Sequence, residues 1–388
     1  MCLCKTHDVI FLSRELIISG LRSNTYFQTT ITGIFFYLKH KGDLRDVEVE
    51  EVQKMLNCGN SFAIYQCKCG YSKVIHFGCN SRVCTHCGKK YTDKWAAQVA
   101  KHTLNVVHRH VVWTIAEQLR PFFEENRELF KILMDCTISA ISRLMKDKTD
   151  KDITPGVVSV IHSFGKDIKF NPHVHSLVTE GGFTKDGKWV PVTYFPFELL
   201  RTDWQDEVLT QFEKALPNTL ENRMLIDYLY DAYPEGFYVN APLEGRVTNR
   251  KQMMRYIGRY IKHPAIAECR IESYDGKVVR FWYDDDDDQR HWVTMIVEEF
   301  IAGIIGHIPD RQFKTVRYYG AYYRVKRMHF KEQLGMISIA QVLLTKYVEK
   351  WAPVCEKCGQ KMELVECWLS KPPSTGEFGK KISDWCYV

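Results

Sequence analysis

Two strand-like runs, residues 156–163 and 173–179, constrain the fold of this chain more than any other part of its sequence. A glycine-containing turn joins them, which is typical of an antiparallel hairpin. His173 and His175 lie two positions apart in the second run, and on a strand such residues point to the same face of the sheet. Val174 then points to the opposite face, which we expect to be packed.

Imidazoles that project side by side form a natural site for a divalent metal ion. The alternative is a pair of ordinary surface histidines, and the His173/His175 pattern alone does not decide between the two. A metal ion needs a third ligand, and His162 lies at the end of the first run. If the runs pair as a hairpin, His162 comes close to the pair, with the register left open. His162 is therefore our candidate for the third ligand.

A helix is expected over residues 248–262, with an apolar face and a basic face. Tyr256 and Tyr260 lie one turn apart at the boundary between these faces, with roughly 5–6 Å between their Cβ atoms. The alternative is two boundary tyrosines that half-bury their rings and expose their hydroxyls. The basic face favours a functional role, because it would hold a phosphate beside both hydroxyls. Its members are Arg255, Arg259 and Lys262.

Six of the fourteen cysteines fall within residues 58–90. The N-terminus has no signal-peptide pattern, so we expect a reducing cytoplasm, where clustered cysteines more often bind metal than form disulfides. The pairs Cys67-x-Cys69 and Cys84-x-x-Cys87, with Cys79 between them, are typical of a structural zinc site. The alternative is a set of free buried thiols. Because four thiolates suffice, Cys58 or Cys79 is a spare or an alternative ligand.

A second cysteine pattern lies near the C-terminus. Cys355-x-x-Cys358 is a weaker signal for zinc, with Cys367 and Cys386 as possible partners.

Basic residues are unevenly distributed, although the net charge is only +6. Residues 67–101 carry seven Lys or Arg and one acidic residue, which suits contact with DNA. Residues 311–331, which include Arg317 and Arg324, interleave seven basic with six aromatic residues and suit single-stranded DNA. The alternative for this stretch is a β-segment with one packed aromatic face, and the two interpretations are compatible. The sequence contains no run of about 18 apolar residues, so it predicts no membrane span.

His173-Val174-His175 together with Tyr256-x-x-x-Tyr260 resembles the two-tyrosine transposases of the HUH nuclease superfamily, the kind found in the IS91 group of insertion sequences. The likeness covers about residues 58–360, and residues 79–88 look like the family's zinc-binding segment. Two departures stand out. Asn171 precedes Pro172 where the family usually has histidine, and the Cys67-x-Cys69 spacing is narrower than usual, which leaves the individual zinc ligands open.

The resemblance implies a reaction. In HUH enzymes a tyrosine attacks the phosphorus, which produces a 5′-phosphotyrosine link and a free 3′-hydroxyl. It implies Mg²⁺ or Mn²⁺ as a Lewis acid on the histidines, structural Zn²⁺ on the cysteines, and single-stranded element ends and target DNA as partners. The residues assigned in this way are Tyr256 and Tyr260 as nucleophiles, His173, His175 and His162 as metal ligands, and Arg255, Arg259, Lys262, Arg317 and Arg324 as DNA contacts.

The coarse pattern of elements completes the expectation. Residues 93–148 and 199–231 read as helical, and residues 265–300 read as β-rich. The acidic run 284–288 is more often a solvated turn than a metal site.

We expect an α+β fold, in which a small zinc module precedes an HUH domain made of an antiparallel sheet with packed helices. Residues 1–92 would hold the zinc module at 58–90. Residues 93–265 would form the nuclease domain, 266–345 a β-rich DNA-binding part, and 346–388 a tail.

The sequence leaves two alternative functions open. A plasmid or phage replication initiator or relaxase would share the nuclease chemistry at a different DNA site. A zinc-dependent DNA-binding protein without catalysis is the alternative of another class, and the histidine and tyrosine pairs argue against it. The expected location is the cytoplasm, in association with the nucleoid, with no membrane partner.

Overall fold

The computed structural model describes about two thirds of the chain in separate stretches. These are residues 42–56, 58, 62–76, 78–79, 81–84, 87, 103–242, 246–247, 265–285, 287–323, 353–369 and 380–381.

The chain divides into two compact units, each built from segments that are distant in sequence. One unit comprises residues 92–262 and 309–336, and the other comprises residues 1–91, 263–308 and 337–388. The linear boundaries expected from the sequence differ from this division. The C-terminal segment returns to the N-terminal unit, and part of the basic aromatic stretch joins the unit of the histidines.

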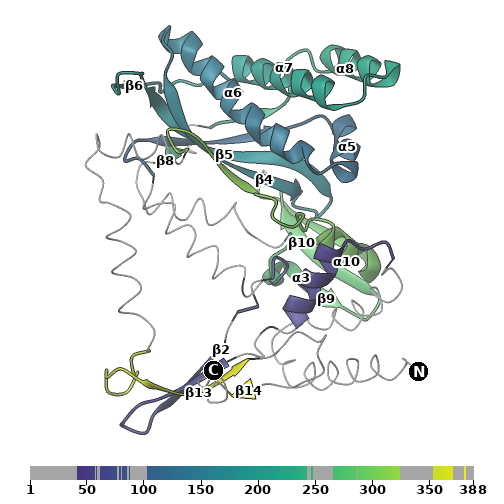
Figure 1. Cartoon of the computed structure of the whole chain (residues 1–388). Coiled ribbons are helices and arrows are strands. Elements are labelled where there is room, and N and C mark those ends of the chain that lie inside the picture. Colours follow the sequence, from purple (N-terminus) through teal and green to yellow (C-terminus); the bar gives the residue numbers. More distant parts are fainter. Residues whose placement is uncertain are drawn as a thin grey trace. The chain divides into compact units, whose positions relative to one another are not determined.

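The first unit is built on a seven-stranded antiparallel sheet with the main order β12-β4-β5-β3-β7 (Figure 1). Two further strands complete it, with β6 paired to β5 and β8 paired to β3. The strands are β3 (His108–Thr114), β4 (Thr154–Phe164), β5 (Phe170–Phe183), β6 (Trp189–Pro191), β7 (Val239–Asn240), β8 (Arg246–Val247) and β12 (Val316–Gly320).

The predicted hairpin is confirmed as β4 and β5, and its register places His162 opposite His173. The strand β5 lies at the centre of the sheet, between β4 and β3. The helical expectation over residues 93–148 is wrong at β3. Residues that point to both faces of that strand are buried, the polar His108, Arg109 and His110 among them, so apolar and polar residues do not alternate as they do on a half-buried strand.

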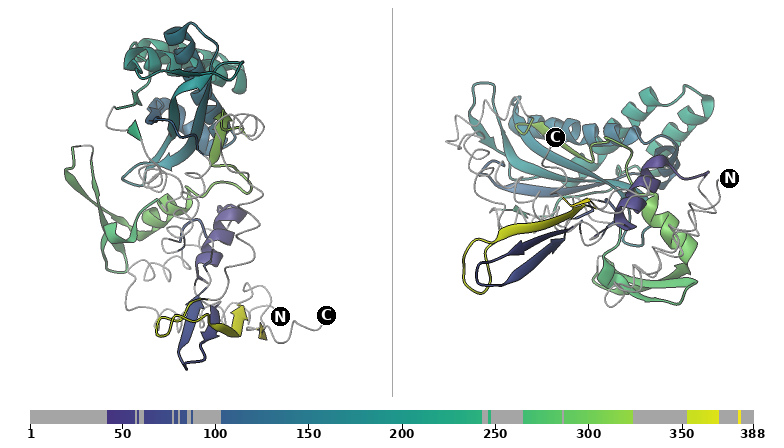
Figure 2. Two further views of the ribbon diagram at one scale, coloured as in Figure 1. Left: turned by 90° about the vertical axis from the view of Figure 1, so that its left-hand side faces the viewer. Right: turned by 60° about the horizontal axis from the view of Figure 1, so that its bottom comes forward.

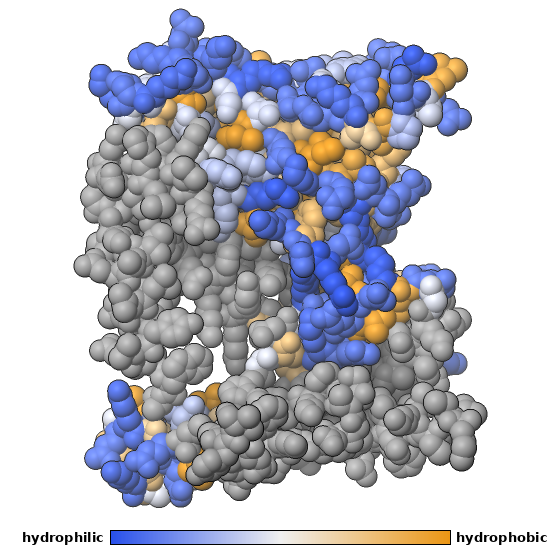
Figure 3. Space-filling model, viewed as in Figure 1, coloured by the Kyte–Doolittle hydropathy of each residue, from blue (hydrophilic) through white to orange (hydrophobic). Residues whose placement is uncertain are grey.

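Helices cover one face of this sheet. In Figure 1, α6 packs on β4 and β5, and α7 packs beside it. The core between them includes Trp113, Val174, Leu133 and Trp204, all fully buried. Hydrophilic residues occupy much of the outer edge of the helical layer in Figure 3. The helical elements are η1 (Glu117–Leu119), α5 (Arg120–Glu125), α6 (Leu129–Thr149), α7 (Phe197–Ala215) and α8 (Leu220–Ala232).

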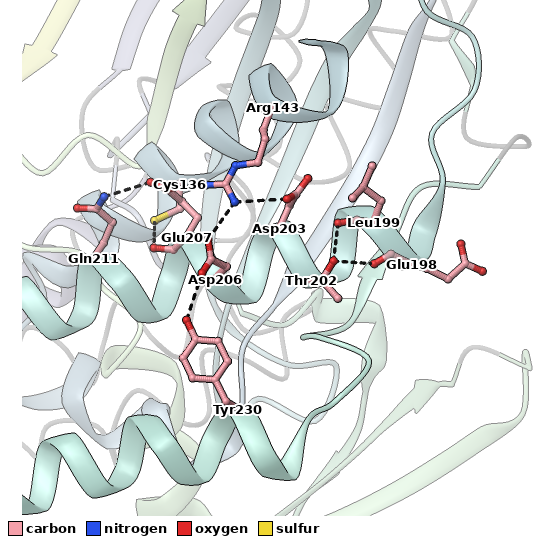
Figure 4. A network of polar contacts seen from close by, with 10 residues as sticks. All are labelled: Cys136, Arg143, Glu198, Leu199, Thr202, Asp203, Asp206, Glu207, Gln211 and Tyr230. Atoms are coloured by element: carbon pink, nitrogen blue, oxygen red, sulfur yellow. Dashed lines mark hydrogen bonds and ion pairs between the residues drawn. The ribbon is translucent and has the colours of Figure 1, made fainter. Parts of the chain in front are cut away.

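Polar contacts fasten α6 to α7, as Figure 4 shows. The Arg143 guanidinium donates to Asp203 at 3.3 Å, to Asp206 at 2.9 Å and to Glu207 at 3.1 Å. Tyr230 of α8 donates its hydroxyl to Asp206 at 3.3 Å. Because Arg143 is partly exposed, we regard this network as orientation of the helices more than as a large source of stability.

A chain of buried hydroxyl groups crosses the helix-covered face behind the histidines. The Trp113 indole N–H donates to Ser176 Oγ at 3.0 Å, and Ser176 Oγ lies 2.9 Å from Ser159 Oγ. Ser159 Oγ lies 2.7 Å from Thr137 Oγ1 of α6. These contacts join β3, β5, β4 and α6, and each buried hydroxyl has a partner, so the register of the histidine strands is held from behind.

The second unit contains two small antiparallel sheets. In the four-stranded sheet, of order β14-β13-β1-β2, a C-terminal strand pairs with an N-terminal hairpin. The other sheet has the order β11-β10-β9. The described elements of the second unit are α3 (Asp46–Leu56), β1 (Phe62–Gln66), β2 (Ser72–His76), η3 (Glu268–Arg270), β9 (Ile271–Tyr274), β10 (Val278–Asp284), β11 (Arg290–Ile296), α10 (Val297–Ile305), β13 (Glu363–Leu369) and β14 (Lys380–Lys381).

The acidic run forms the end of β10 and the turn that leads into β11, as the solvated-turn interpretation predicts. Asp284 pairs with Arg290 at 3.0 Å, and Asp285 pairs with His291 at 2.6 Å. The α+β class with antiparallel sheets and a cysteine-containing N-terminal module is confirmed. None of the described helices has the length and apolar character of a membrane span.

Candidate metal centres

Three histidines from neighbouring strands meet on the face of the large sheet opposite α6. One ligand nitrogen from each of His162, His173 and His175 lies within 4.8 Å of the others. The Nε2 atoms of His173 and His175 are 3.1 Å apart, and the ring centroid of His162 lies 4.6 Å from that of His175. The structure thus brings together the three histidines that the sequence singles out, one from β4 and two from β5.

Hydrogen bonding sets the tautomer of His173. Its Nδ1 lies 2.7 Å from the Asn171 carbonyl oxygen, which can only accept. Nδ1 therefore carries the hydrogen, and Nε2 keeps the lone pair that a metal ligand needs. Because the contact uses the backbone carbonyl, it does not depend on the side chain at this position, where the sequence departs from the family pattern.

Burial favours the neutral form of His173 and His175. Loss of solvation, with an added contribution from Arg120, lowers the pKa of His173 below its usual value. Burial, assisted by His162, His173 and His110, holds the pKa of His175 well below its usual value. A neutral imidazole is the form that binds metal, so the protein environment favours ligation near neutral pH.

A fourth histidine, His110 of β3, adjoins the centre and was not singled out from the sequence. Its Nε2 lies 3.0 Å from His175 Nδ1, and the two rings stack with centroids 5.2 Å apart. Burial lowers the pKa of His110 to about 3. A signal was available, because His108 and His110 repeat the alternating pattern of His173 and His175 on a strand.

Four cysteines of the N-terminal region form one compact group: Cys58, Cys79, Cys84 and Cys87. Cys58 Sγ lies 3.5 Å from Cys87 Sγ and 3.7 Å from Cys84 Sγ. The Cys79 backbone N–H donates to Cys87 Sγ at 3.3 Å. Neither Cys58 nor Cys79 is a spare in this arrangement, because both belong to the group.

The remaining pair of the expected zinc module lies elsewhere. Cys67 and Cys69 group with Cys355 and Cys358, instead of with the pair at 84 and 87. The sequence spacing predicts one site for both N-terminal pairs, and it offers residues 367 and 386 as possible partners of Cys355 and Cys358. Residue 367 lies on β13, and residue 386 lies outside the described residues.

The basic aromatic stretch is described only as far as residue 323. Tyr319 donates its hydroxyl to Asp135 at 2.7 Å, and the ring of Tyr322 is buried against the sheet, where its hydroxyl contacts His108. Tyr323 is exposed. The packing interpretation therefore holds for Tyr319 and Tyr322. Arg317 is half-buried on β12.

The expected tyrosine helix lies outside the described residues. So do Tyr256, Tyr260, Arg255, Arg259, Lys262 and Arg324.

The segment that contains the three histidines and the N-terminal segment that contains the cysteines each match a known protein family. Residues 156–329 match a family described as putative transposase, and residues 30–115 match one described as transposase zinc-binding domain. A transposase for insertion sequence element IS801 from Pseudomonas savastanoi pv. phaseolicola is 30% identical over 309 residues, 73% of this chain and 72% of that protein. A putative transposase, y4qJ, from Sinorhizobium fredii (strain NBRC 101917 / NGR234) is 26% identical over 69% of this chain and 73% of its own length. No solved structure matches the chain significantly.

Two of the three candidate metal centres lie wholly within the matched segments, and the third lies only partly within them. The three histidines fall within the 156–329 match, and the whole of the group containing Cys58 falls within the 30–115 match. Cys355 and Cys358 fall outside both.

Proposed function

The chain belongs to the IS91-like family of rolling-circle transposases, and from this premise we propose that it cuts and rejoins single-stranded DNA through a covalent link to tyrosine. The two relatives named above are both described as transposases, which favours this function over a replication initiator or relaxase with the same chemistry. A DNA-binding protein without catalysis would have no use for the histidine centre. The DNA of the nucleoid would be its working partner.

The observation that carries the proposal is the convergence of three imidazoles on one sheet face. His162, His173 and His175 offer ligand nitrogens within 4.8 Å of one another, which suits one divalent ion. Imidazole nitrogen fits Mn²⁺ better than Mg²⁺, which prefers oxygen ligands, although either ion can serve if water completes the shell. When bound, the ion would polarise a non-bridging oxygen of the scissile phosphate.

Tyr256 and Tyr260 are the proposed nucleophiles. In the first step a tyrosine oxygen forms a bond to phosphorus, the bond from phosphorus to the 3′-oxygen breaks, and the 3′-oxygen leaves with a proton as a hydroxyl. In the second step a 3′-hydroxyl attacks the phosphotyrosine, restores a phosphodiester and returns the proton to tyrosine. A free tyrosine has a pKa of about 10, so its ionisation needs the help of nearby positive charge.

The proposed source of that charge is the basic face of the tyrosine helix. Arg255, Arg259 and Lys262 follow the spacing of one helix face in the sequence, and guanidinium groups pair well with phosphate oxygens. Arg317 and Arg324 are proposed to hold the DNA strand further along.

A covalent-capture assay tests the proposal. A labelled single-stranded oligonucleotide that carries the element's own end is incubated with the protein and Mn²⁺ or Mg²⁺. We expect an adduct that survives SDS and depends on the metal ion. It should disappear in His173→Ala/His175→Ala and in Tyr256→Phe/Tyr260→Phe.

Tyr228→Phe is the matched control, because Tyr228 is exposed on α8, in the helical layer, and lies outside the proposed site. It should form the adduct at the wild-type level. Binding of the oligonucleotide with no cleavage or adduct under either metal would refute the nuclease. An adduct that persists in the double tyrosine variant would refute the assigned nucleophiles.

A further inference from the structure

Four cysteine thiols from opposite ends of the chain converge outside the histidine centre. Cys67 and Cys69 follow β1, and Cys355 and Cys358 precede β13. The Sγ atoms of Cys67 and Cys358 are 3.4 Å apart, and those of Cys69 and Cys355 are 3.6 Å apart. All four sulfur atoms lie within 4.8 Å of one another.

The sulfur–sulfur distances distinguish a zinc–thiolate site from a pair of disulfides. A disulfide requires a sulfur–sulfur distance of about 2.05 Å, well below the distances here. A tetrahedral zinc ion with bonds of about 2.3 Å to sulfur places its ligands roughly 3.8 Å apart. The observed 3.4 and 3.6 Å fit the second arrangement.

The two cysteine pairs sit in turns of the same design. Each pair is followed by a glycine with a positive φ, Gly70 at 86° and Gly359 at 73°, a conformation that favours glycine. In both turns the first cysteine donates its N–H to a carbonyl beyond the glycine at 2.8 Å and accepts the glycine N–H on its own carbonyl at 2.9 Å. The Lys357 N–H also donates to Cys355 Sγ at 3.4 Å, which favours a thiolate.

The strands beside the turns join the same two segments. β1 pairs with β13 in antiparallel register from Phe62 opposite Trp368 to Gln66 opposite Glu363, and Figure 2 shows the C-terminal strand beside the N-terminal hairpin. Buried Met362 packs against Cys67 and Cys355.

Side chains add to this junction. Glu356 accepts the Tyr71 hydroxyl at 3.2 Å and forms an ion pair with Lys73. Both partners lie on the N-terminal hairpin or next to it, and Glu356 lies between the C-terminal cysteines. The two turns therefore contact each other through side chains as well as through the facing thiols.

We propose that Cys67, Cys69, Cys355 and Cys358 bind a second structural zinc ion, which ties the C-terminal segment to the N-terminal module. Four thiols lose their protons as the ion binds, so binding is coupled to the folding of both segments. The zinc-binding domain matched at residues 30–115 contains a complete four-cysteine set of its own, and the second set needs residues beyond it. This inference does not rest on the nuclease chemistry.

The consequence is a split module. Half of its ligands come from one end of the chain and half from the other, with more than 280 residues between them. Closing so long a loop carries a substantial entropic cost, which the metal–thiolate bonds offset. Removal of the C-terminal segment would therefore disturb the N-terminal hairpin that lies within the matched zinc domain.

Zinc content of the purified full-length protein tests the proposal. The measurement is made in a His173→Ala/His175→Ala background, so that the histidine centre takes up no zinc. Two zinc ions per chain are expected. Cys355→Ser/Cys358→Ser and Cys58→Ser/Cys79→Ser should each retain one, and the control Cys269→Ser, an exposed cysteine outside both groups, should retain two. Two ions retained in Cys355→Ser/Cys358→Ser would overturn the proposal.

Alkylation of the unaltered protein covers the case in which a variant does not fold. Cys69, Cys358 and Cys269 are all exposed, so solvent access alone would make them react at similar rates. With zinc bound, iodoacetamide and peptide mapping should show Cys269 modified first, with Cys69 and Cys358 protected until a chelator is added. Equal modification of Cys358 and Cys269 in the zinc-loaded protein would also overturn the proposal.

Discussion

His110 Nε2 lies 3.0 Å from His175 Nδ1, the ring nitrogen of His175 that does not face His173. If His175 binds a metal ion through Nε2, its Nδ1 carries the hydrogen and donates to His110. Such a contact fixes the tautomer and the orientation of a metal-binding imidazole. His110 is therefore a positioning residue for the histidine centre, and it acts from the neighbouring strand β3.

Replacement of His110 should weaken metal binding without removing a ligand. We expect His110→Ala to lower the Mn²⁺ affinity by about 10- to 100-fold, with His110→Gln recovering part of the loss because its amide oxygen can accept the hydrogen bond. Isothermal titration with Mn²⁺ measures the change, and the melting temperature is followed in parallel. His291→Ala, on β11 in the other unit, serves as the control. Wild-type affinity in His110→Ala would exclude the positioning role.

His162 should contribute a ligand and influence the choice of metal ion. His162→Ala should lower the Mn²⁺ affinity, since one of three converging nitrogens is lost. His162→Asp should raise the affinity for Mg²⁺ relative to Mn²⁺, because Mg²⁺ prefers carboxylate oxygen. Competition titrations with the two ions give the ratio. An unchanged ratio in His162→Asp would show that this side chain does not reach the bound ion.

A buried ion pair should be important for the stability of the large sheet. Arg109 and Glu180 are 2% and 1% exposed, and Arg109 Nη2 lies 2.6 Å from Glu180 Oε1. Glu180→Gln leaves a buried guanidinium without its counter-charge, which typically costs about 3–5 kcal/mol of unfolding free energy. Denaturant unfolding of the full-length protein measures the loss.

The matched control for this pair is an exposed one. Lys185 and Asp152 are 3.3 Å apart and 87% and 77% exposed, so Lys185→Ala should change the unfolding free energy by less than about 1 kcal/mol. Similar losses from Glu180→Gln and Lys185→Ala would contradict the importance of burial.

Stability should fall in mild acid because of His108. Burial lowers the pKa of His108 to about 4, against an ordinary value of 6.5. Between these pH values the unfolded chain binds a proton at His108 and the folded protein does not. The unfolding free energy therefore increases as the pH rises from about 4 to 6.5, and it decreases as the pH falls through the same window. The full effect is about 3 kcal/mol.

A comparison of unfolding free energies at several pH values tests this sign. His108→Gln keeps a polar group beside the Tyr322 hydroxyl and removes the titration, so its slope over this window should be shallower than that of the wild type. His110 is buried in the same way and contributes to the slope that remains. A slope in His108→Gln that is as steep as that of the wild type would show that His108 is not the group responsible.

Local rules account for much of what could be predicted. Alternation along a strand placed His173 and His175 on one face, and the glycine-containing turn between two short runs indicated the hairpin that brings His162 opposite His173. Helical periodicity located the helices over residues 199–231. The same reasoning failed at β3, because a strand buried on both faces loses the alternation on which the prediction depends.

Sequence alone thus determined the ligand types, the hairpin and the family of this protein, since each depends on residues close together in the chain. Only the tertiary structure decided the partners of the cysteines and the place of His110. The spacing of Cys67 and Cys69 carries no information about Cys355 and Cys358. These two cysteines lie in a turn near the other end of the chain, and the fold brings their thiols beside those of the first pair. His110 meets His175 because β3 pairs with β5. Such pairings arise from the register of distant strands, which local periodicity does not specify.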